Sequence, residues 1–388
     1  MINLANRMER LGTETAFEVL AKAKKLEEKG RNIIHLQIGE PDFNTPANII
    51  NAGKTALDNG YTNYNPSGGY IELKEEIRKY SKKIRSVEFD NDQVIITSGA
   101  KPIMFYTILA LINPGDEVLY PNPGFPIYES MINFAGGKAV PLKLEENLDY
   151  KFDIEKLESL ITSKTKLIIL NSPNNPCGSI INSEEMAKIA SILEDKDITV
   201  LSDEIYSQFL YEGSHSSISN YKSISDKTII LDGFSKSYSM TGWRIGYGIF
   251  PKELVEPITK LITNSNSCTA SFTQIAAIEA LKGSQESVSK MVSEFKARRN
   301  LIVDGLNNIK NINCPNPSGA FYVFPNITNT GISSEEFANR LLEENGVATL
   351  AGESFGKEGR GYIRLSFANS KDNIIEALNR IESFVNKL

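Results

Sequence analysis

The residues best placed to do chemistry follow apolar runs of the chain. Asp203 comes after the run at residues 198–201, and Lys236 comes after the run at residues 228–231 between small hydroxyl residues. A lysine among small neighbours can act as an amine nucleophile and as a proton carrier. An acid at the end of a buried strand needs a hydrogen-bonding or charged partner. The plainer alternatives are an N-cap at Asp203 and a surface lysine at Lys236.

The histidine and cysteine content limits the other chemistries. The chain has only two histidines, His35 and His215, and three cysteines that stand far apart, Cys177, Cys268 and Cys314. We therefore expect no metal site of cysteine and histidine ligands, and no disulfide scaffold. A group other than histidine is expected to move protons.

Charge and hydropathy argue against two kinds of partner. The chain carries 42 basic and 48 acidic residues, a formal net charge of −6, which does not favour nucleic acid. No apolar run approaches the roughly 18 residues of a membrane span, so we expect no membrane partner. Arg7, Glu9 and Arg10 stand where a signal peptide would be apolar, and the sequence therefore predicts a cytoplasmic protein.

Two further segments place polar groups after apolar runs. The sequence SGAK at residues 98–101 follows the run at 94–97. Small residues there can expose backbone N–H groups to an anion, although a plain strand–helix turn is the alternative. In the loop at residues 171–178, two prolines bracket Asn174 and Asn175, so this loop can present an amide side chain rigidly.

The elements that position these residues follow from the alternation of apolar runs with helical patterns. Runs of even hydrophobicity indicate strands buried on both faces, and the helices between them indicate a mostly parallel sheet. Ligands of such α/β sheets collect at the carboxyl ends of the strands. From about residue 280 the pattern changes to long amphipathic helices with short strands at 321–323 and 362–367. We predict a large domain over 45–285, and a smaller α+β domain from 1–44 and 286–388.

Six segments together resemble the aspartate aminotransferase family, the pyridoxal 5′-phosphate (PLP) enzymes of fold type I. They are IGEPDF at 38–43, the segment with Tyr64 and Gly69, SPNNPCG at 172–178, SDEIY at 202–206, GFSKSYSMTGWRIG at 233–246, and GYIRLSFA at 361–368. Their order and spacing match the family over essentially the whole chain. The resemblance implies a large domain with a mostly parallel sheet of the seven-stranded type, flanked by helices, plus a smaller α+β domain.

The resemblance also implies the cofactor-binding residues. Lys236 is expected to form the internal aldimine with PLP, and Asp203 to pair with the pyridine nitrogen. Such an acid keeps the ring nitrogen protonated, as the cofactor's role of electron sink requires. The remaining contacts are a ring 3′-oxygen held by Tyr206 and Asn175, a ring face stacked on Phe125, and a phosphate held by Arg244, Ser235 and the N–H groups of Gly99, Ala100 and Lys101.

The expected substrate contacts centre on Arg364, which should bind the α-carboxylate with help from Asn175 and the backbone of Gly39. Arginine suits this role because its guanidinium binds a carboxylate through two parallel hydrogen bonds. Lys101 stands where some relatives use a lysine to bind the distal carboxylate of a dicarboxylic substrate. Thr13 and Thr15, the latter an expected substrate contact, lie in the N-terminal segment that those relatives use as a lid. Tyr64 is expected to reach the phosphate of the other subunit, which implies a homodimer with shared active sites.

Three positions depart from the family pattern. Gly233 stands where many relatives carry a serine, Cys177 stands where threonine is common, and Phe125 stands where aspartate-specific members typically carry tryptophan. The last departure weighs against aspartate, whereas Lys101 and Thr15 weigh for it. We expect an aminotransferase that moves the amino group of an L-amino acid, with aspartate or another dicarboxylic amino acid favoured, to a 2-oxo acid such as 2-oxoglutarate by a ping-pong route.

Three alternatives remain open from the sequence. A carbon–sulfur lyase, or an aminotransferase for aromatic or alanine-type donors, would share every motif above. An aminotransferase-like regulatory sensor is disfavoured by the acidic charge and by a family match that begins within the first 40 residues.

Overall fold

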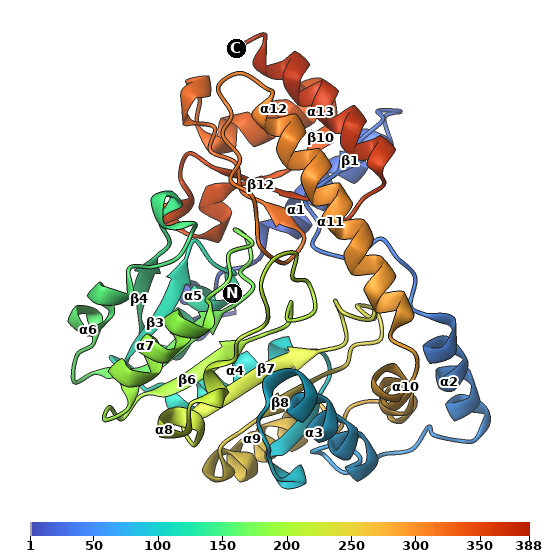
Figure 1. The fold of residues 1–388 in the computed structure, drawn as a ribbon, viewed down its shortest axis with the longest axis vertical. Coiled ribbons are helices and arrows are strands. Elements are labelled where there is room, and N and C mark those ends of the chain that lie inside the picture. The colour runs from blue at the N-terminus through green and yellow to red at the C-terminus, as the bar shows by residue number, and fades with distance from the viewer. Residues whose placement is uncertain (1) are drawn as a thin grey trace.

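A seven-stranded sheet forms the centre of the computed structural model, which describes residues 2–388 (Figure 1). The strand order across the sheet is β2, β8, β7, β6, β5, β3, β4. All neighbouring strands pair in parallel except β8, which runs against both of its neighbours. The strand bounds are Val94–Thr97 (β2), Glu117–Asn122 (β3), Lys138–Lys143 (β4), Thr165–Asn171 (β5), Thr199–Asp203 (β6), Thr228–Gly233 (β7) and Gly246–Ile249 (β8).

The mostly parallel sheet predicted from the apolar runs is confirmed. Adjacent residues of β6 show why its sequence is continuously apolar: Val200 and Leu201 are both fully buried, but they pack into hydrophobic clusters on opposite faces. Two strands of the sheet, β4 and β8, were not predicted, because their sequences contain no continuous apolar run. The sequence of β4 (KAVPLK) is exposed at both ends, and that of β8 (GYGI) contains two glycines, so neither carries the pattern of a buried parallel strand.

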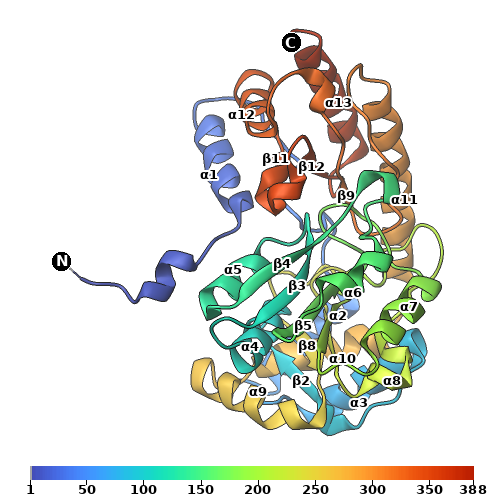
Figure 2. The same cartoon turned by 90° about the vertical axis from the view of Figure 1, so that its left-hand side faces the viewer.

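Helices cover both faces of the sheet, as Figure 2 shows in edge view. On one face pack α4 (Lys101–Leu111), α5 (Ile127–Ala135) and α9 (Lys252–Ser265). The opposite face carries α6 (Leu157–Leu160), α7 (Ser183–Leu193) and α8 (Lys222–Ser225). At the β2 edge lie α2 (Ala47–Asp58), α3 (Ile71–Arg85) and α10 (Ser271–Lys282).

The C-terminal part forms a second group of elements above the sheet in Figure 1. Three long helices, α11 (Glu286–Asn307), α12 (Ser334–Asn345) and α13 (Lys371–Val385), pack around an antiparallel sheet of β11 (Leu350–Ala351), β12 (Ile363–Ser366) and β9 (Tyr322–Val323). The N-terminal segment joins this part, because β1 (Ile34–His35) pairs in parallel with β10 (Val347–Ala348). The domain boundaries at 44/45 and 285/286 stay a prediction.

The first helix, α1 (Thr15–Glu27), also lies beside the C-terminal part, where Ala23 packs against Leu342 and Ala348. The first described residues, 2–5, extend away from the body in Figure 2. Among residues 2–388, no helix is both long and apolar enough to cross a membrane. Short 3-10 helices complete the chain: Asn6–Arg10, Asn91–Gln93, Glu146–Leu148, Ile154–Lys156, Ile218–Asn220, Thr328–Thr330, Gly352–Phe355 and Lys357–Gly359.

Candidate active site

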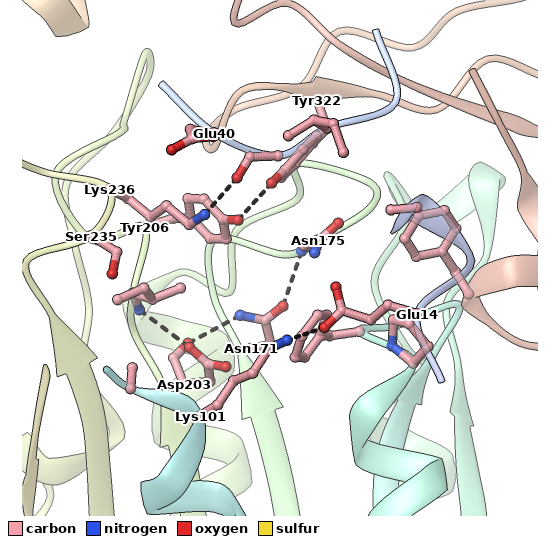
Figure 3. Close-up of a pocket in the computed structure, with 18 of the residues that line it drawn as sticks. Glu14, Glu40, Lys101, Asn171, Asn175, Asp203, Tyr206, Ser235, Lys236 and Tyr322 are labelled. Carbon is pink, nitrogen blue, oxygen red and sulfur yellow. Dashed lines mark hydrogen bonds and ion pairs between the residues drawn. The ribbon is translucent and has the colours of Figure 1, made fainter. Parts of the chain in front are cut away.

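A cavity of about 370 Å³ lies between the carboxyl ends of the parallel strands and the C-terminal part (Figure 3). Asn171 and Asp203 end β5 and β6, Lys236 follows β7, and Arg364 reaches in from β12. The cavity brings together most of the residues singled out from the sequence: Thr15, Gly39, Ala100, Lys101, Phe125, Asn175, Asp203, Tyr206, Ser235, Lys236, Arg244 and Arg364. Gly99 and Tyr64 do not line it.

Lys236 stands in the wall of the cavity with its amine directed inward. Its Nζ donates a hydrogen bond to the carbonyl oxygen of Gly39 at 2.5 Å and lies 5.9 Å from the centre of the Phe321 ring. Burial lowers the pKa of the amine to about 8, against the opposing effect of the Glu40 carboxylate. About a tenth of this amine is therefore uncharged at pH 7, far more than for an ordinary lysine, and the uncharged form is the one that a nucleophile or base requires.

Asp203 is a buried carboxylic acid whose hydrogen-bond partners are uncharged. It accepts a hydrogen bond from the Tyr128 hydroxyl at 2.6 Å and one from the backbone N–H of Ile205 at 3.3 Å. Burial outweighs these bonds and raises its pKa to about 6. The residues directly after Asp203 form a turn and not a helix, so the N-cap alternative fails. A cation placed against this carboxylate would relieve the desolvation cost.

Arg364 is buried with one of its donors free. Its Nη1 donates to Oδ1 of Asn175 at 3.0 Å and its Nη2 to the carbonyl oxygen of Gln37 at 2.5 Å. Its Nε has no hydrogen-bond partner among the described residues. The guanidinium carbon lies 4.4 Å and 4.8 Å from the ring centres of Tyr322 and Phe355. A buried cation with an unsatisfied donor is suited to an anionic ligand such as a carboxylate.

Two tyrosines, Tyr206 and Tyr322, line the cavity together with Lys236, Asp203 and Arg364. The hydroxyl groups of Tyr206 and Tyr322 lie 2.7 Å apart and share a hydrogen bond, and burial raises the pKa of both, so they stay protonated. A side chain at Gly39 would collide with the Tyr322 hydroxyl. Because position 39 is glycine, the backbone can pack closely against Tyr322, and in this position its carbonyl oxygen accepts the hydrogen bond from Lys236.

Backbone geometry forms a cradle at the start of α4. Gly99 has a φ of +90°, and a Cβ there would collide with the guanidinium of Arg244. Arg244 itself has a φ of +53° and donates from Nη1 to the carbonyl oxygen of Thr241 at 2.8 Å. With Ser235 and Ala100 in the adjoining wall, a helix N-terminus and an arginine meet at one end of the cavity. This arrangement suits a phosphate group.

Lys101 lies at the rim of the cavity, paired with Glu14. Its Nζ is 5.3 Å from the centre of the Phe125 ring. Thr15, the first residue of α1, lies beside Glu14 in the same wall. Tyr64 is 87% exposed and outside the cavity, so folding of a single protomer does not bring it to the site.

Behind the site, Arg85 from α3 holds two acids that adjoin the functional loops. Its Nε donates to Glu204 Oε2 at 2.6 Å and its Nη2 donates to Asp232, and all three side chains are buried. His215 adds a hydrogen bond to Glu204 Oε2 at 2.7 Å. Glu204 follows Asp203 directly, so this network fixes the end of β6.

Sequence reasoning missed Glu14, Tyr128, Tyr322 and Arg85 as contributors to the site. None of these four residues lies in one of the six segments that carry the family resemblance. For Tyr128 a signal existed, since it lies only three residues after Phe125, the residue expected to stack on the cofactor ring. For the others, no local pattern indicated the partner.

Comparison with known proteins agrees with this geometry. The family model "Aminotransferase class I and II" matches residues 31–381. Aspartate aminotransferase of Pyrococcus horikoshii is 41% identical over 370 residues, which is 94% of this chain and 93% of that protein. A (5-formylfuran-3-yl)methyl phosphate transaminase of Methanocaldococcus jannaschii is 40% identical over 386 residues, 99% and 100% of the two chains.

A solved structure extends the likeness to three dimensions. The aspartate aminotransferase of Rhizobium meliloti superposes with a TM-score of 0.96 at 31% identity, and the match covers 100% of both chains. The family inferred from the motifs is therefore confirmed. This chain is a transaminase and belongs to the class I and II aminotransferase family.

Proposed function

We propose that the cavity binds PLP, attached covalently at Lys236, and that the enzyme transfers the amino group of a dicarboxylic L-amino acid to a 2-oxo acid. The observation that carries this proposal is that one cavity is lined by a buried lysine whose pKa is lowered to about 8 and by a buried acid with no cationic partner among residues 2–388. Both line the same cavity as Arg364, whose Nε is unsatisfied. When bound, PLP supplies an electron sink that labilises the bonds to the substrate's Cα.

The residues of the cavity fit PLP at each end. Asp203 has a carboxylate that a protonated ring nitrogen would stabilise, and Tyr206 has a hydroxyl that can serve the ring 3′-oxygen. The cradle of Gly99, Ala100, Ser235 and Arg244 fits the phosphate. Phe125 offers a ring face for stacking, and its edge-to-face contact with Tyr128, with ring centres 5.6 Å apart, fixes its position.

On the substrate side, Arg364 would bind the α-carboxylate through the donor that is now unsatisfied. Asn175 already orients the guanidinium by accepting its Nη1–H. The Lys236 amine would be the base that takes the proton from Cα of the amino donor, and it would deliver a proton to Cα of the 2-oxo acid in the second half-reaction, because burial lowers its pKa to about 8. The carbonyl of Gly39 holds that amine at the cavity wall. A histidine has no part in this scheme.

Two observations support a dicarboxylic donor. Lys101 places an ammonium group at the rim of the cavity that Arg364 also lines, where a second carboxylate of the substrate could reach it. Several relatives are named aspartate aminotransferases. The M. jannaschii relative carries a different name at nearly the same identity, so sequence likeness alone does not select the donor.

The test has two stages. Protein loaded with PLP and reduced with borohydride is digested, and mass spectrometry locates the modified lysine, which we expect to be Lys236. The loaded protein is then mixed with each standard amino acid while the visible absorbance is followed. Aspartate or glutamate should react fastest, and Lys101→Ala should weaken these two selectively. Modification at another lysine, or equal losses for alanine and aromatic donors, would contradict the proposal.

We further propose a homodimer with shared active sites. In the single protomer Tyr64 is 87% exposed, and Ile2 and Leu4 are 92% and 72% exposed on the segment that extends from the body, which supports a partner surface. Light scattering should give twice the 43.0 kDa chain mass. We place the enzyme in the cytoplasm, where its three free cysteines would stay reduced.

A further inference from the structure

Glu14 is a charged group of the cavity that the proposed reaction does not use. It is the N-cap residue of α1, yet its side chain makes no capping hydrogen bond to that helix. The carboxylate instead forms an ion pair with the Nζ of Lys101, as Figure 3 shows. Glu14 is the more buried partner, with 17% of its side chain exposed against 49% for Lys101. The Glu14 carboxylate therefore binds the Lys101 ammonium group from the more buried side of the ion pair.

The negative charge of Glu14 also acts on two other cations of the cavity. Burial is the main cause that lowers the pKa of Lys236 and of Arg364, and the negative charge of Glu14 opposes that effect at both residues. Glu14 thus places a carboxylate among the cations that the cavity offers to a substrate. A carboxylate on the side chain of a substrate would seek the same ammonium group.

We propose that Glu14 is a specificity-determining residue that competes with the distal carboxylate of the substrate for Lys101. The inference rests on the proposed dicarboxylate function, which it deepens. An amino acid with a second carboxylate must displace Glu14 or bind beside it against like-charge repulsion, whereas a donor with a neutral side chain meets neither cost. Glu14 therefore weakens the binding of dicarboxylic substrates and reduces the selectivity for them that Lys101 alone would give.

The chain around Glu14 allows this exchange without loss of the segment. Gly12 donates its backbone N–H to Ser130 Oγ at 2.9 Å, and Arg10 Nε donates to the carbonyl oxygen of Asn133 at 2.7 Å. Both contacts hold the segment before Glu14 on α5. The first residues of α1 follow directly, so the carboxylate can leave Lys101 by rotating its side chain while its backbone stays in place.

The test measures binding of two unreactive acids to the PLP-loaded protein by calorimetry. Succinate carries two carboxylates, and butyrate is the matched acid with one. Glu14→Gln should tighten succinate binding about fivefold, as expected for loss of a competing, partly exposed ion pair, and should leave butyrate unchanged. Glu18→Gln is the matched control, because this exposed residue of α1 does not line the cavity. It should alter neither affinity.

The outcomes separate this inference from the proposed function. Unchanged or weaker succinate binding by Glu14→Gln overturns the role of Glu14, and so does an equal gain for butyrate or no measurable succinate binding by either protein. The proposed function fails on different results, namely no uptake of PLP, or a wild-type enzyme that reacts with neutral donors and not with aspartate or glutamate. Glu14→Ala repeats the measurement with a shorter side chain and should shift succinate binding in the same direction.

Discussion

The buried acid Asp203 should leave a signature in the stability of the cofactor-free protein. Burial raises its pKa from 3.8 to about 6, so between pH 4 and 6 the native state holds a proton that the unfolded chain releases. The contribution of Asp203 to the free energy of unfolding therefore falls as pH rises through this window. The difference of about two pKa units corresponds to roughly 3 kcal/mol.

Asp203→Asn removes this titration. The free energy of unfolding of the variant minus that of the wild type should rise by about 3 kcal/mol from pH 3 to pH 7, with about 2 kcal/mol of the rise between pH 4 and pH 6, and level off above pH 7. A stability cost of the asparagine that does not depend on pH shifts this difference equally at every pH, so it does not affect the comparison. Urea unfolding of cofactor-free protein at several pH values measures it, with Asp58→Asn, an exposed residue of α2, as the control for lost charge. A flat difference refutes the reasoning, and a falling one would mean that the pKa is depressed.

Three further predictions follow from the same geometry. Tyr128→Phe removes a hydrogen bond to the Asp203 carboxylate and should lower the acid dissociation constant of Asp203 about 10- to 100-fold. Carboxyl-carbon NMR measures this constant, with Tyr150→Phe as the control. An unchanged constant would contradict the role given to the Tyr128 hydroxyl. Glu40→Gln removes a charge that raises the pKa of Lys236, so the pH midpoint for PLP uptake should move below about 8; an upward move would oppose it. Arg85→Met leaves Glu204 and Asp232 buried without their cation and should cost about 3–5 kcal/mol of stability; a loss under 1 kcal/mol in urea unfolding would argue against the network.

The central residues of the site could be predicted because they obey a local rule. Asp203 ends a strand of continuous apolar sequence and Lys236 follows another, and parallel strands bring their carboxyl ends to one edge of a sheet. Asn175 was found for the same reason, since its loop follows β5. Arg364 was inferred from the resemblance alone, because its short strand belongs to the C-terminal part.

The supporting contacts could not be predicted, because they join residues far apart in the chain. Tyr128 meets Asp203 across 75 positions, Tyr206 meets Tyr322 across 116, and Lys101 meets Glu14 across 87. No periodicity encodes such a pairing. The antiparallel strand β8 was missed for a different reason: its glycines make room for its neighbours, since a Cβ at Gly246 would collide with the backbone of Ala100, and a strand of small residues lacks an apolar pattern.

The most direct test of the central claim follows the two half-reactions on one sample. PLP-loaded protein receives aspartate without an acceptor, and 2-oxoglutarate is added afterwards. We expect the visible absorbance of lysine-bound PLP to disappear with the first addition and to return with the second, and Lys236→Ala to show neither change. Steady release of ammonia and pyruvate from cysteine without any acceptor would indicate a lyase, and a wild-type protein that gains no visible absorbance from PLP would contradict the account.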